Sequence, residues 1–315
     1  MPGPRHLVVV GPTATGKSGL ALELARSRPG VELVSVDSMQ VYRGMDIGTA
    51  KPTPAEQAEV PHHLLDLVEP SEGFSAARFA ALARRALAEI EGRGHTAVLV
   101  GGTGLYVQAV LGDVTPPGEW PAVRAGLEDA LRDGDATHGP AALHERLAEL
   151  DPLAASRIGV GNTRRLIRAL EVTLGSGRPF SSYGPGLTAY PPREGFALVG
   201  VWLPRVVNAE RIAERVAAMV EAGLVGEVAG LAARPAGLGR TARQALGYKE
   251  LLAHVEHGAP LAGCLAETVR RTRQFARRQR VWFRRDPRVR WYGTSLRPER
   301  LLPGLLEELD RCRKV

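Results

Sequence analysis

The 315-residue sequence is poor in cysteine and has no long apolar run, and each absence excludes a class of protein. Its two cysteines, Cys264 and Cys312, cannot form a disulfide framework, and neither stands at a spacing typical of metal ligands. No stretch reaches the about 18 apolar residues of a membrane-spanning helix, and the run at residues 7–10 is too short for a secretion signal. We therefore expect a cytoplasmic protein that does not enter a membrane.

Lysine is also scarce, so that 37 of the 41 basic residues are arginine. The four lysines are Lys17, Lys51, Lys249 and Lys314. Between residues 270 and 290, ten arginines stand against one acid, Asp286. This segment has a net charge of +9. Because the formal charge of the whole chain is +7, the rest of the chain carries −2. Because a concentrated basic segment is typical of a polyanion site, the sequence predicts a phosphate-rich partner such as nucleic acid.

Several short apolar runs without alternation are bounded by glycine or proline, as in strands that are buried on both faces of a parallel sheet. They lie at residues 7–10, 31–36, 97–100 and 198–203. Helical patterns follow from 17 to about 27 and from about 75 to 91. With 44% hydrophobic and 24% charged residues, the composition is that of an ordinary globular protein. These patterns predict an α/β fold.

The segment that follows the first apolar run fits the phosphate-loop pattern G-x-x-x-x-G-K-[ST], directly before a helix. It reads Gly11, Pro12, Thr13, Ala14, Thr15, Gly16, Lys17 and Ser18. Loop amides and the helix N-terminus can bind phosphate oxygens, Lys17 supplies a cation, and the Ser18 hydroxyl can ligate Mg²⁺. We therefore expect a P-loop NTPase-like parallel sheet flanked by helices.

The composition between residues 113 and 196 differs from that of the flanking sequence, because alanine-, arginine- and glutamate-rich helical segments are interrupted there by proline and glycine. We interpret 113–196 as a helical insertion. Residues 1–112 and 197–315 then form the α/β core, with a mainly helical C-terminal part.

An acid that organises the metal of an NTPase is missing where it is expected, since the strand at 97–100 runs into Gly101-Gly102-Thr103-Gly104. The strand at 31–36 does end in Asp37, at the edge of the sheet where ligands of open α/β folds bind. Asp37 is therefore the candidate general base. The alternative is an aspartate that caps its own turn.

Taken together, the motifs resemble the tRNA dimethylallyltransferase family over nearly the whole chain. The resemblance rests on the phosphate loop and on VDSMQVY at 36–42, MDIGTAKP at 45–52, PHHLLD at 61–66, VGGTGLY at 100–106, RRLIRALEV at 164–172, ALGYKE at 245–250, TRQFARRQ at 272–279 and the pair Trp282-Phe283.

This resemblance implies transfer of a dimethylallyl group from dimethylallyl diphosphate to N6 of the adenosine 3′-adjacent to the anticodon in tRNA. The phosphate loop and Mg²⁺ would then hold the departing diphosphate, with Thr13 and Ser18 in contact with diphosphate and metal. Asp37 would accept or orient the amine proton. Of two arginines four apart on one helix face, the family favours Arg215 for the diphosphate, while Arg211 stays open. The catalytic set is thus Asp37, Lys17, Thr13 and Arg215.

For tRNA contact, we expect four groups of positions, of which the resemblance marks three. Three are Asp37, Ser38, Met39 and Gln40; Arg164, Arg165, Leu166, Ile167 and Arg168; and Gln244, Ala245, Leu246, Gly247, Tyr248 and Lys249, with Thr103 and Arg124 as additions. The fourth, which is Arg273, Arg277 and Arg278, comes from the basic segment itself. By helical spacing alone, one arginine stripe forms a phosphate-facing ridge, made of Arg270, Arg273, Arg277, Arg280 and Arg284. His62 and His63 have no metal-spaced partners, and we expect structural roles for them.

Three other functions are compatible with parts of the pattern. A P-loop small-molecule kinase would use Asp37 as base but would not need the basic segment. An adenylate isopentenyltransferase acting on free nucleotide would need neither that segment nor a helical insertion. A nucleotide-gated RNA-binding module would leave Asp37 without a role. We expect a monomer whose partners are the tRNA anticodon stem-loop and dimethylallyl diphosphate.

Overall fold

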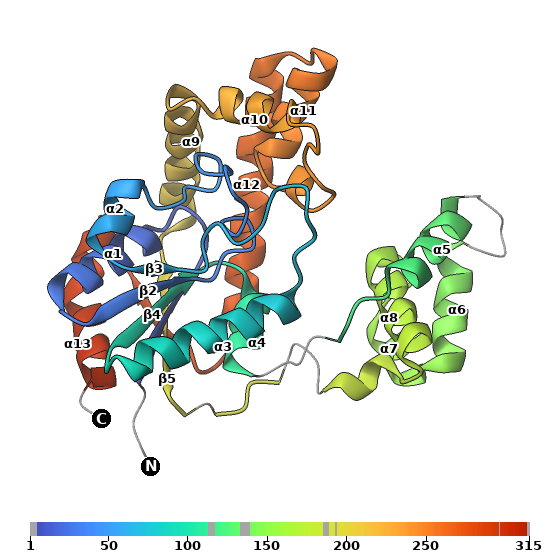
Figure 1. The fold of residues 1–315 in the computed structure, drawn as a ribbon, viewed down its shortest axis with the longest axis horizontal. Coiled ribbons are helices and arrows are strands. Elements are labelled where there is room, and N and C mark those ends of the chain that lie inside the picture. Colours follow the sequence, from blue (N-terminus) through green and yellow to red (C-terminus); the bar gives the residue numbers. More distant parts are fainter. Residues whose placement is uncertain are drawn as a thin grey trace. The chain divides into compact units, whose positions relative to one another are not determined.

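The computed structural model describes residues 5–112, 117–132, 139–184, 189–192, 194–295 and 297–313. The chain divides into two compact units, one of Met1–Leu111 with Tyr190–Val315 and the other of Gly112–Ala189 (Figure 1). The predicted start of the insertion at 113 lies outside the described residues. Its predicted end at 196 is too late, because Phe196 already pairs with His6 in the sheet of the first unit.

The first unit is built on a parallel sheet whose strand order is β3-β2-β4-β1-β5-β6. The strands are β1 His6–Val10, β2 Val31–Ser35, β3 His62–His63, β4 Thr96–Gly101, β5 Phe196–Trp202 and β6 Arg290–Gly293. Val8 of the central strand pairs with Leu99 of β4 and with Leu198 of β5. The four predicted strands are confirmed. The sequence did not indicate the edge strands β3 and β6, since they are short and carry polar or aromatic residues rather than an apolar run.

Helices cover both faces of this sheet, which explains why the strands do not alternate between apolar and polar residues (Figure 1). One face packs against α1 Lys17–Ser27 and α13 Leu302–Arg313, where Leu7 and Val9 join the cluster that contains Leu305. The other face lies under α3 Ala76–Gly92 and α4 Gly104–Leu111, with Val8 and Val10 in its cluster. The carboxyl ends of β1, β2 and β4 meet at one edge, so the loops after them are neighbours.

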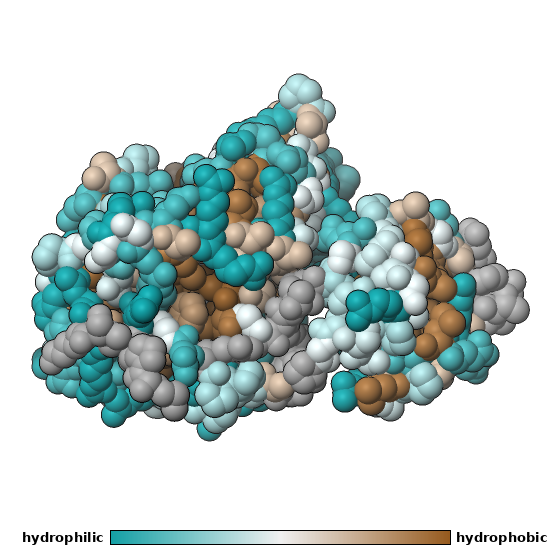
Figure 2. All heavy atoms as spheres, turned by 60° about the horizontal axis from the view of Figure 1, so that its bottom comes forward, coloured by the Kyte–Doolittle hydropathy of each residue, from teal (hydrophilic) through white to brown (hydrophobic). Residues whose placement is uncertain are grey.

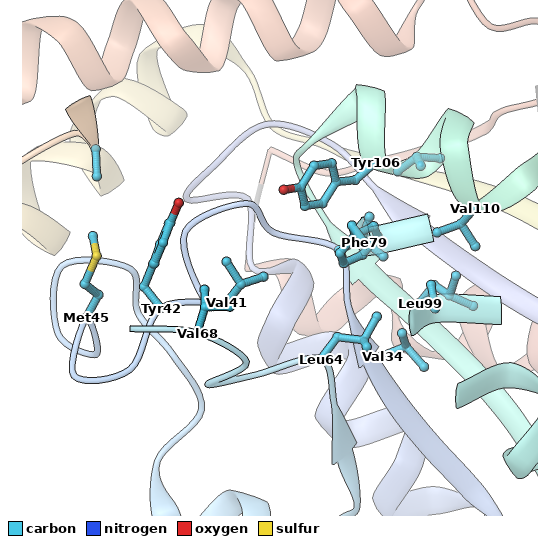
Figure 3. Packing of buried hydrophobic residues seen from close by; sticks show 14 of the residues in the cluster. Val34, Val41, Tyr42, Met45, Leu64, Val68, Phe79, Leu99, Tyr106 and Val110 are labelled. Atoms are coloured by element: carbon cyan, nitrogen blue, oxygen red, sulfur yellow. The ribbon is translucent and has the colours of Figure 1, made fainter. Parts of the chain in front are cut away.

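The segment after β2 is anchored by its apolar side chains. Val41, Tyr42 and Met45 are fully buried, in the same cluster as Phe79 and Tyr106 (Figure 3). The rings of Phe79 and Tyr106 stack with centroids 4.0 Å apart. This packing holds the chain that immediately follows Asp37.

The remaining helices of the first unit complete its surface. They are α2 Pro54–Glu59, α9 Arg205–Glu221, α10 Leu224–Ala232, α11 Tyr248–His257, α12 Leu261–Phe283 and the short 3-10 helices η3 Ala242–Gln244 and η4 Pro298–Leu301. No helix in the described ranges combines the length and apolar character needed to cross a bilayer. Figure 2 shows one face of the molecule, on which hydrophilic residues dominate and apolar residues form confined patches.

The second unit is helical, as predicted for the insertion. It contains α5 Pro121–Arg132, α6 Pro140–Leu150, α7 Pro152–Arg157, α8 Thr163–Ser176 and the 3-10 helix η2 Phe180–Tyr183. Its own core includes Leu147, Leu166 and Leu170, all fully buried. Asp151 caps α7 by accepting the Ala154 N–H at 3.0 Å.

Candidate active site

The phosphate loop joins β1 to α1 in a conformation that depends on its glycines. Gly11 has a φ of +144°, and a β-carbon there would lie 2.2 Å from the Val201 carbonyl oxygen. Gly16, at the N-terminus of α1, has a φ of +88°. Ala14 also adopts a positive φ, +62°, which is uncommon for a residue with a side chain. The loop therefore has a strained conformation that its surroundings must maintain.

Two side chains of the loop bind its own backbone. The Thr15 hydroxyl donates to the Pro12 carbonyl at 2.9 Å, and the Lys17 ammonium donates to the same oxygen at 2.6 Å. Lys17 is buried, so the loop folds over its only cation.

Two helices that are about 200 residues or more from the phosphate loop in sequence form hydrogen bonds with its backbone. From α9, Asn208 Nδ2 donates to the Thr13 carbonyl at 2.9 Å and Arg211 Nε donates to the Ala14 carbonyl at 3.1 Å. From α12, Gln279 Oε1 accepts the Thr13 N–H at 2.8 Å. Sequence reasoning missed Asn208 and Gln279. Their only signals were that Asn208 shares a helix face with Arg211 and that Gln279 closes the TRQFARRQ block.

Lys17, Arg215 and Asp37 come together at the carboxyl edge of the sheet. Burial, and then the charge of Arg215, lower the pKa of Lys17 to about 7, while Asp37 opposes this effect. Burial also lowers the pKa of Arg215, which Asp37 raises and Arg211 lowers. The Nε of Arg211 donates a hydrogen bond to the loop backbone, whereas Arg215 has no hydrogen-bond partner among the described residues. The geometry thus favours Arg215 as the arginine that can bind an anion.

Asp37 caps its own turn and still keeps an oxygen for chemistry. Its Oδ1 accepts the Met39 N–H at 2.8 Å, and Oδ2 has no hydrogen-bond partner in the described part of the chain. The next residue, Ser38, donates its N–H to Thr103 Oγ1 at 3.1 Å, so the loops after β2 and β4 are joined. The two interpretations of Asp37 are therefore compatible.

The other two residues of the predicted 37–40 group face the protein. Gln40 is buried, accepts the Ser35 hydroxyl at 2.7 Å and donates to the carbonyl of Thr49 at 3.2 Å. Met39 is half-buried against the core. Only Asp37 and Ser38 of this group present polar atoms toward the site.

The predicted 244–249 group splits between core and surface. Ala245, Gly247 and Tyr248 are buried and Leu246 is half-buried, whereas Gln244 and Lys249 are exposed. Lys249 Nζ donates to Gln244 Oε1 at 3.0 Å. From this group, the side chains open to a ligand are therefore those of Gln244 and Lys249.

The Tyr248 side chain has a structural partner that the sequence did not reveal. Its hydroxyl donates to Glu227 Oε1 at 2.5 Å, and burial raises the pKa of Tyr248. The Glu227 carboxylate also accepts the N–H groups of Asp46, Ile47 and Gly48, at 2.7–3.1 Å. This carboxylate therefore fixes the MDIGTAKP segment to α10 and α11.

The ten arginines between residues 270 and 290, on the basic helix α12 and after it, differ in their contacts. Four of the ten pair with an acid among the described residues: Arg270 with Glu267, Arg271 with Glu250, Arg288 with Asp286 and Arg290 with Glu308. Arg277, Arg278, Arg284 and Arg285 are exposed and have no acidic partner in the described ranges.

Two members of the arginine ridge contact the protein itself. Arg273 is exposed and donates to the Ala209 carbonyl at 3.2 Å. The Arg280 guanidinium lies over the Trp202 ring, 5.3 Å from its centroid, and burial lowers the pKa of Arg280. Within the ridge, Arg277 and Arg284 are therefore the arginines whose side chains have no hydrogen-bond, ion-pair or ring partner in the described ranges.

In the second unit, the predicted 164–168 group also divides. Arg164 and Arg165 are exposed in the first turn of α8, whereas Leu166 and Ile167 belong to the core of the unit. Arg168 binds the buried Glu171 at 2.8 Å and the carbonyls of Pro117 and Gly118 at 3.0 Å.

Arg124 also uses its side chain within the second unit. Its Nε donates to Glu128 at 3.0 Å, and its Nη1 lies 3.7 Å from Glu171. Of the arginines marked for RNA contact in this unit, Arg164 and Arg165 alone are exposed and without a hydrogen-bond partner in the described chain.

The structural roles expected for His62 and His63 are confirmed. His62 Nδ1 lies 2.7 Å from the Val60 carbonyl, and His63 Nε2 lies 2.6 Å from the buried carboxylate of Glu32.

Comparisons with known proteins show the family of the chain. A family model described as IPP transferase matches residues 40–286. The tRNA dimethylallyltransferase of Streptomyces coelicolor is 48% identical over 305 residues, which cover 96% of this chain and 95% of the relative.

Solved structures of similar proteins extend the likeness to the fold. The full-length tRNA isopentenylpyrophosphate transferase of Bacillus halodurans is 37% identical, with a TM-score of 0.69 over 98% of this chain and 97% of that one. A eukaryotic dimethylallyltransferase described as acting on tRNA is 25% identical, with a TM-score of 0.71 over 92% of this chain and 74% of that one.

Proposed function

This chain belongs to the IPP transferase family, and we propose from that membership that it transfers a dimethylallyl group from dimethylallyl diphosphate to tRNA. The acceptor is N6 of the adenosine 3′-adjacent to the anticodon, and diphosphate is released. The observation that carries the proposal is the convergence of Lys17, Arg215 and Asp37 at the phosphate loop. Two cations and a carboxylate in one site match a reaction that expels an anion and removes a proton.

In this reaction, the bond between the allylic carbon and the diphosphate oxygen breaks while the bond from N6 to that carbon forms. The electron pair of the broken bond leaves with diphosphate, whose growing charge Lys17 and Arg215 stabilise. The proton that N6 loses goes to Asp37, whose Oδ2 is the acceptor not used by the turn. No phosphoryl group moves, so the site needs no attacking water.

The residues present are compatible with Mg²⁺ as cofactor. Ser18 is exposed at the start of α1 and has no hydrogen-bond partner in the described chain, whereas Thr15 uses its hydroxyl on the loop. No group of three His, Cys, Asp or Glu residues in the described ranges could hold a metal ion. Ser18 would therefore hold the ion together with diphosphate oxygens, and the ion would add positive charge beside the leaving group.

The anticodon stem-loop is the macromolecular partner in this proposal. Unpaired arginines of α12, with Arg277 among them, neutralise backbone phosphates and contribute a salt-dependent affinity. The adenosine leaves the stack to reach Asp37, as bases do in enzymes that modify them. The proposal includes a monomeric enzyme that acts in the cytoplasm.

One experiment distinguishes this proposal from a kinase, a free-nucleotide prenyltransferase and an RNA-binding module. The protein is incubated with labelled dimethylallyl diphosphate and Mg²⁺, and with tRNA, tRNA that lacks adenosine beside the anticodon, or AMP. We expect label in the intact tRNA alone. Label in AMP would favour the free-nucleotide prenyltransferase. Phosphorylation in the presence of ATP would favour a kinase, and RNA binding without any transfer would favour the RNA-binding module.

A further inference from the structure

The buried side chain of Gln279 joins two loops of the site. Its Oε1 accepts the Thr13 N–H at 2.8 Å, and its Nε2 donates to the Gly102 carbonyl at 2.9 Å. Because Thr13 offers a donor and Gly102 an acceptor, the orientation of the amide is determined by its partners. The glutamine therefore links the loop after β1 to the loop after β4.

One of these loops binds the donor in the proposed reaction, and the other is connected to the segment that carries the proton acceptor. Thr13 lies in the phosphate loop that holds the donor. Gly102 precedes Thr103, whose Oγ1 accepts the N–H of Ser38, the neighbour of Asp37. A chain of three contacts thus runs from the phosphate loop through Gln279 and Thr103 to the segment that carries the proton acceptor.

The fit around Gln279 leaves little freedom. The residue is 7% exposed, and a β-carbon on Gly102 would lie 2.1 Å from its Nε2. Only a side chain of this length that carries one acceptor and one donor can serve both loops. Glutamate lacks the donor when ionised, and asparagine is one methylene shorter.

We propose that Gln279 is a positioning residue that sets the distance between the diphosphate end of the donor and the acceptor amine beside Asp37. The inference rests on the proposed function. It does not make Gln279 a ligand, since both of its polar ends are occupied by backbone groups. A misplacement of reacting atoms by about 1 Å can cost about 100-fold in rate, so the residue acts on turnover rather than on affinity.

The test compares Gln279→Met with Gln57→Met, a matched control in the same unit that loses one hydrogen bond, to the Pro52 carbonyl at 2.8 Å. We expect Gln279→Met to lower kcat about 10- to 100-fold, while its Kd for inorganic diphosphate changes by less than about threefold. Gln57→Met keeps both constants. A kcat for Gln279→Met equal to that of the control, or a loss of diphosphate affinity that accounts for the lost rate, overturns the proposal.

A second variant tests the requirement for one donor and one acceptor. Protonated glutamate carries one donor and one acceptor, as glutamine does, and burial favours the protonated form. The deficit of Gln279→Glu relative to the unaltered enzyme should therefore shrink as pH falls from about 8 to about 6. A deficit that does not change with pH contradicts the role.

If the unaltered enzyme transfers no label, the proposed function fails, and the link between the loops is then tested by amide exchange at Thr13. We expect exchange of this amide to be faster in Gln279→Met than in Gln57→Met. Equal exchange overturns the link.

Discussion

The Lys17 ammonium donates a hydrogen bond to the Pro12 carbonyl of its own phosphate loop, 2.6 Å away. The buried amine lies near the charge of Arg215, and its pKa falls to about 7. Since an arriving diphosphate favours the charged form, its binding raises this pKa and draws a proton from solvent.

Proton uptake on binding is therefore the first prediction. At about pH 8, a lysine with this pKa is mostly neutral, so we expect binding of diphosphate to take up a proton. Calorimetry in buffers of different ionisation enthalpy measures this uptake. Lys17→Arg is the matched control, because arginine is already charged before diphosphate binds. Any proton uptake by diphosphate itself is the same for both proteins, so it does not contribute to the difference between them. Equal uptake by both would contradict the prediction.

Arg215 and Arg211 should differ in their effect on the diphosphate. We expect Arg215→Gln to weaken diphosphate binding about 10- to 100-fold, because a charge-assisted contact is lost. It should also reduce proton uptake at about pH 8, since the pKa of Lys17 rises when a neighbouring like charge is removed. Arg211→Gln, which loses the bond to Ala14, should have the smaller effect on affinity. The reverse order of the two affinities would assign the anion to Arg211.

Asp37→Asn tests the proton acceptor without disturbing its turn. Asparagine retains an oxygen for the Met39 N–H but cannot take the proton of N6. We expect kcat to fall about 10²- to 10⁴-fold, with a Kd for tRNA that stays within about threefold. Single-turnover assays and filter binding measure the two constants. A parallel collapse of affinity would make Asp37 a binding residue instead.

The arginines of α12 should differ in salt dependence according to whether an acid neutralises them. Arg277→Gln should reduce the slope of log affinity for tRNA against log salt by about 0.7 to 0.9, as for one lost phosphate contact. Arg270 is already paired with Glu267 at 2.6 Å, so Arg270→Gln should change the slope less. Arg85→Gln on α3, which removes a similar pair with Glu89, controls for net charge. Equal slopes for Arg277→Gln and Arg85→Gln would exclude a local phosphate contact.

Glu32 predicts how stability depends on acid. Burial alone raises the pKa of this carboxyl, but hydrogen bonds from Arg93, His63 and His95 lower it to about 2. Because the folded value lies below the ordinary value of 4.5, the contribution is present above pH 4.5 and is lost as the pH falls toward 2. Its full size is about 3 kcal/mol. Urea titrations between about pH 6 and about pH 3 should show less acid sensitivity in Glu32→Gln.

The control for this prediction is Glu59→Gln, which removes a carboxylate that pairs with Arg26 at the surface. Exposed pairs contribute little to stability, so its acid sensitivity should match that of the unaltered protein. If both variants behave alike, the buried cluster is not the cause.

The sequence by itself determined the β–loop–α unit, its parallel sheet and the phosphate loop. These features are local, because an apolar run, a bounding glycine and an eight-residue motif each specify nearby backbone. It also identified Asp37, which directly follows an apolar run, and Lys17, which is part of the phosphate-loop motif. The resemblance to a family added Arg215 and the RNA-facing segments.

Only the tertiary structure decided which of these side chains remain open to a ligand. Tyr248 lies in the core on Glu227, and Arg168 binds Glu171, although both stand in motifs marked for RNA. Asn208 and Gln279 reach Thr13 across 195 and 266 residues. No local pattern encodes such contacts, because they exist only once packing has brought α9 and α12 to the phosphate loop.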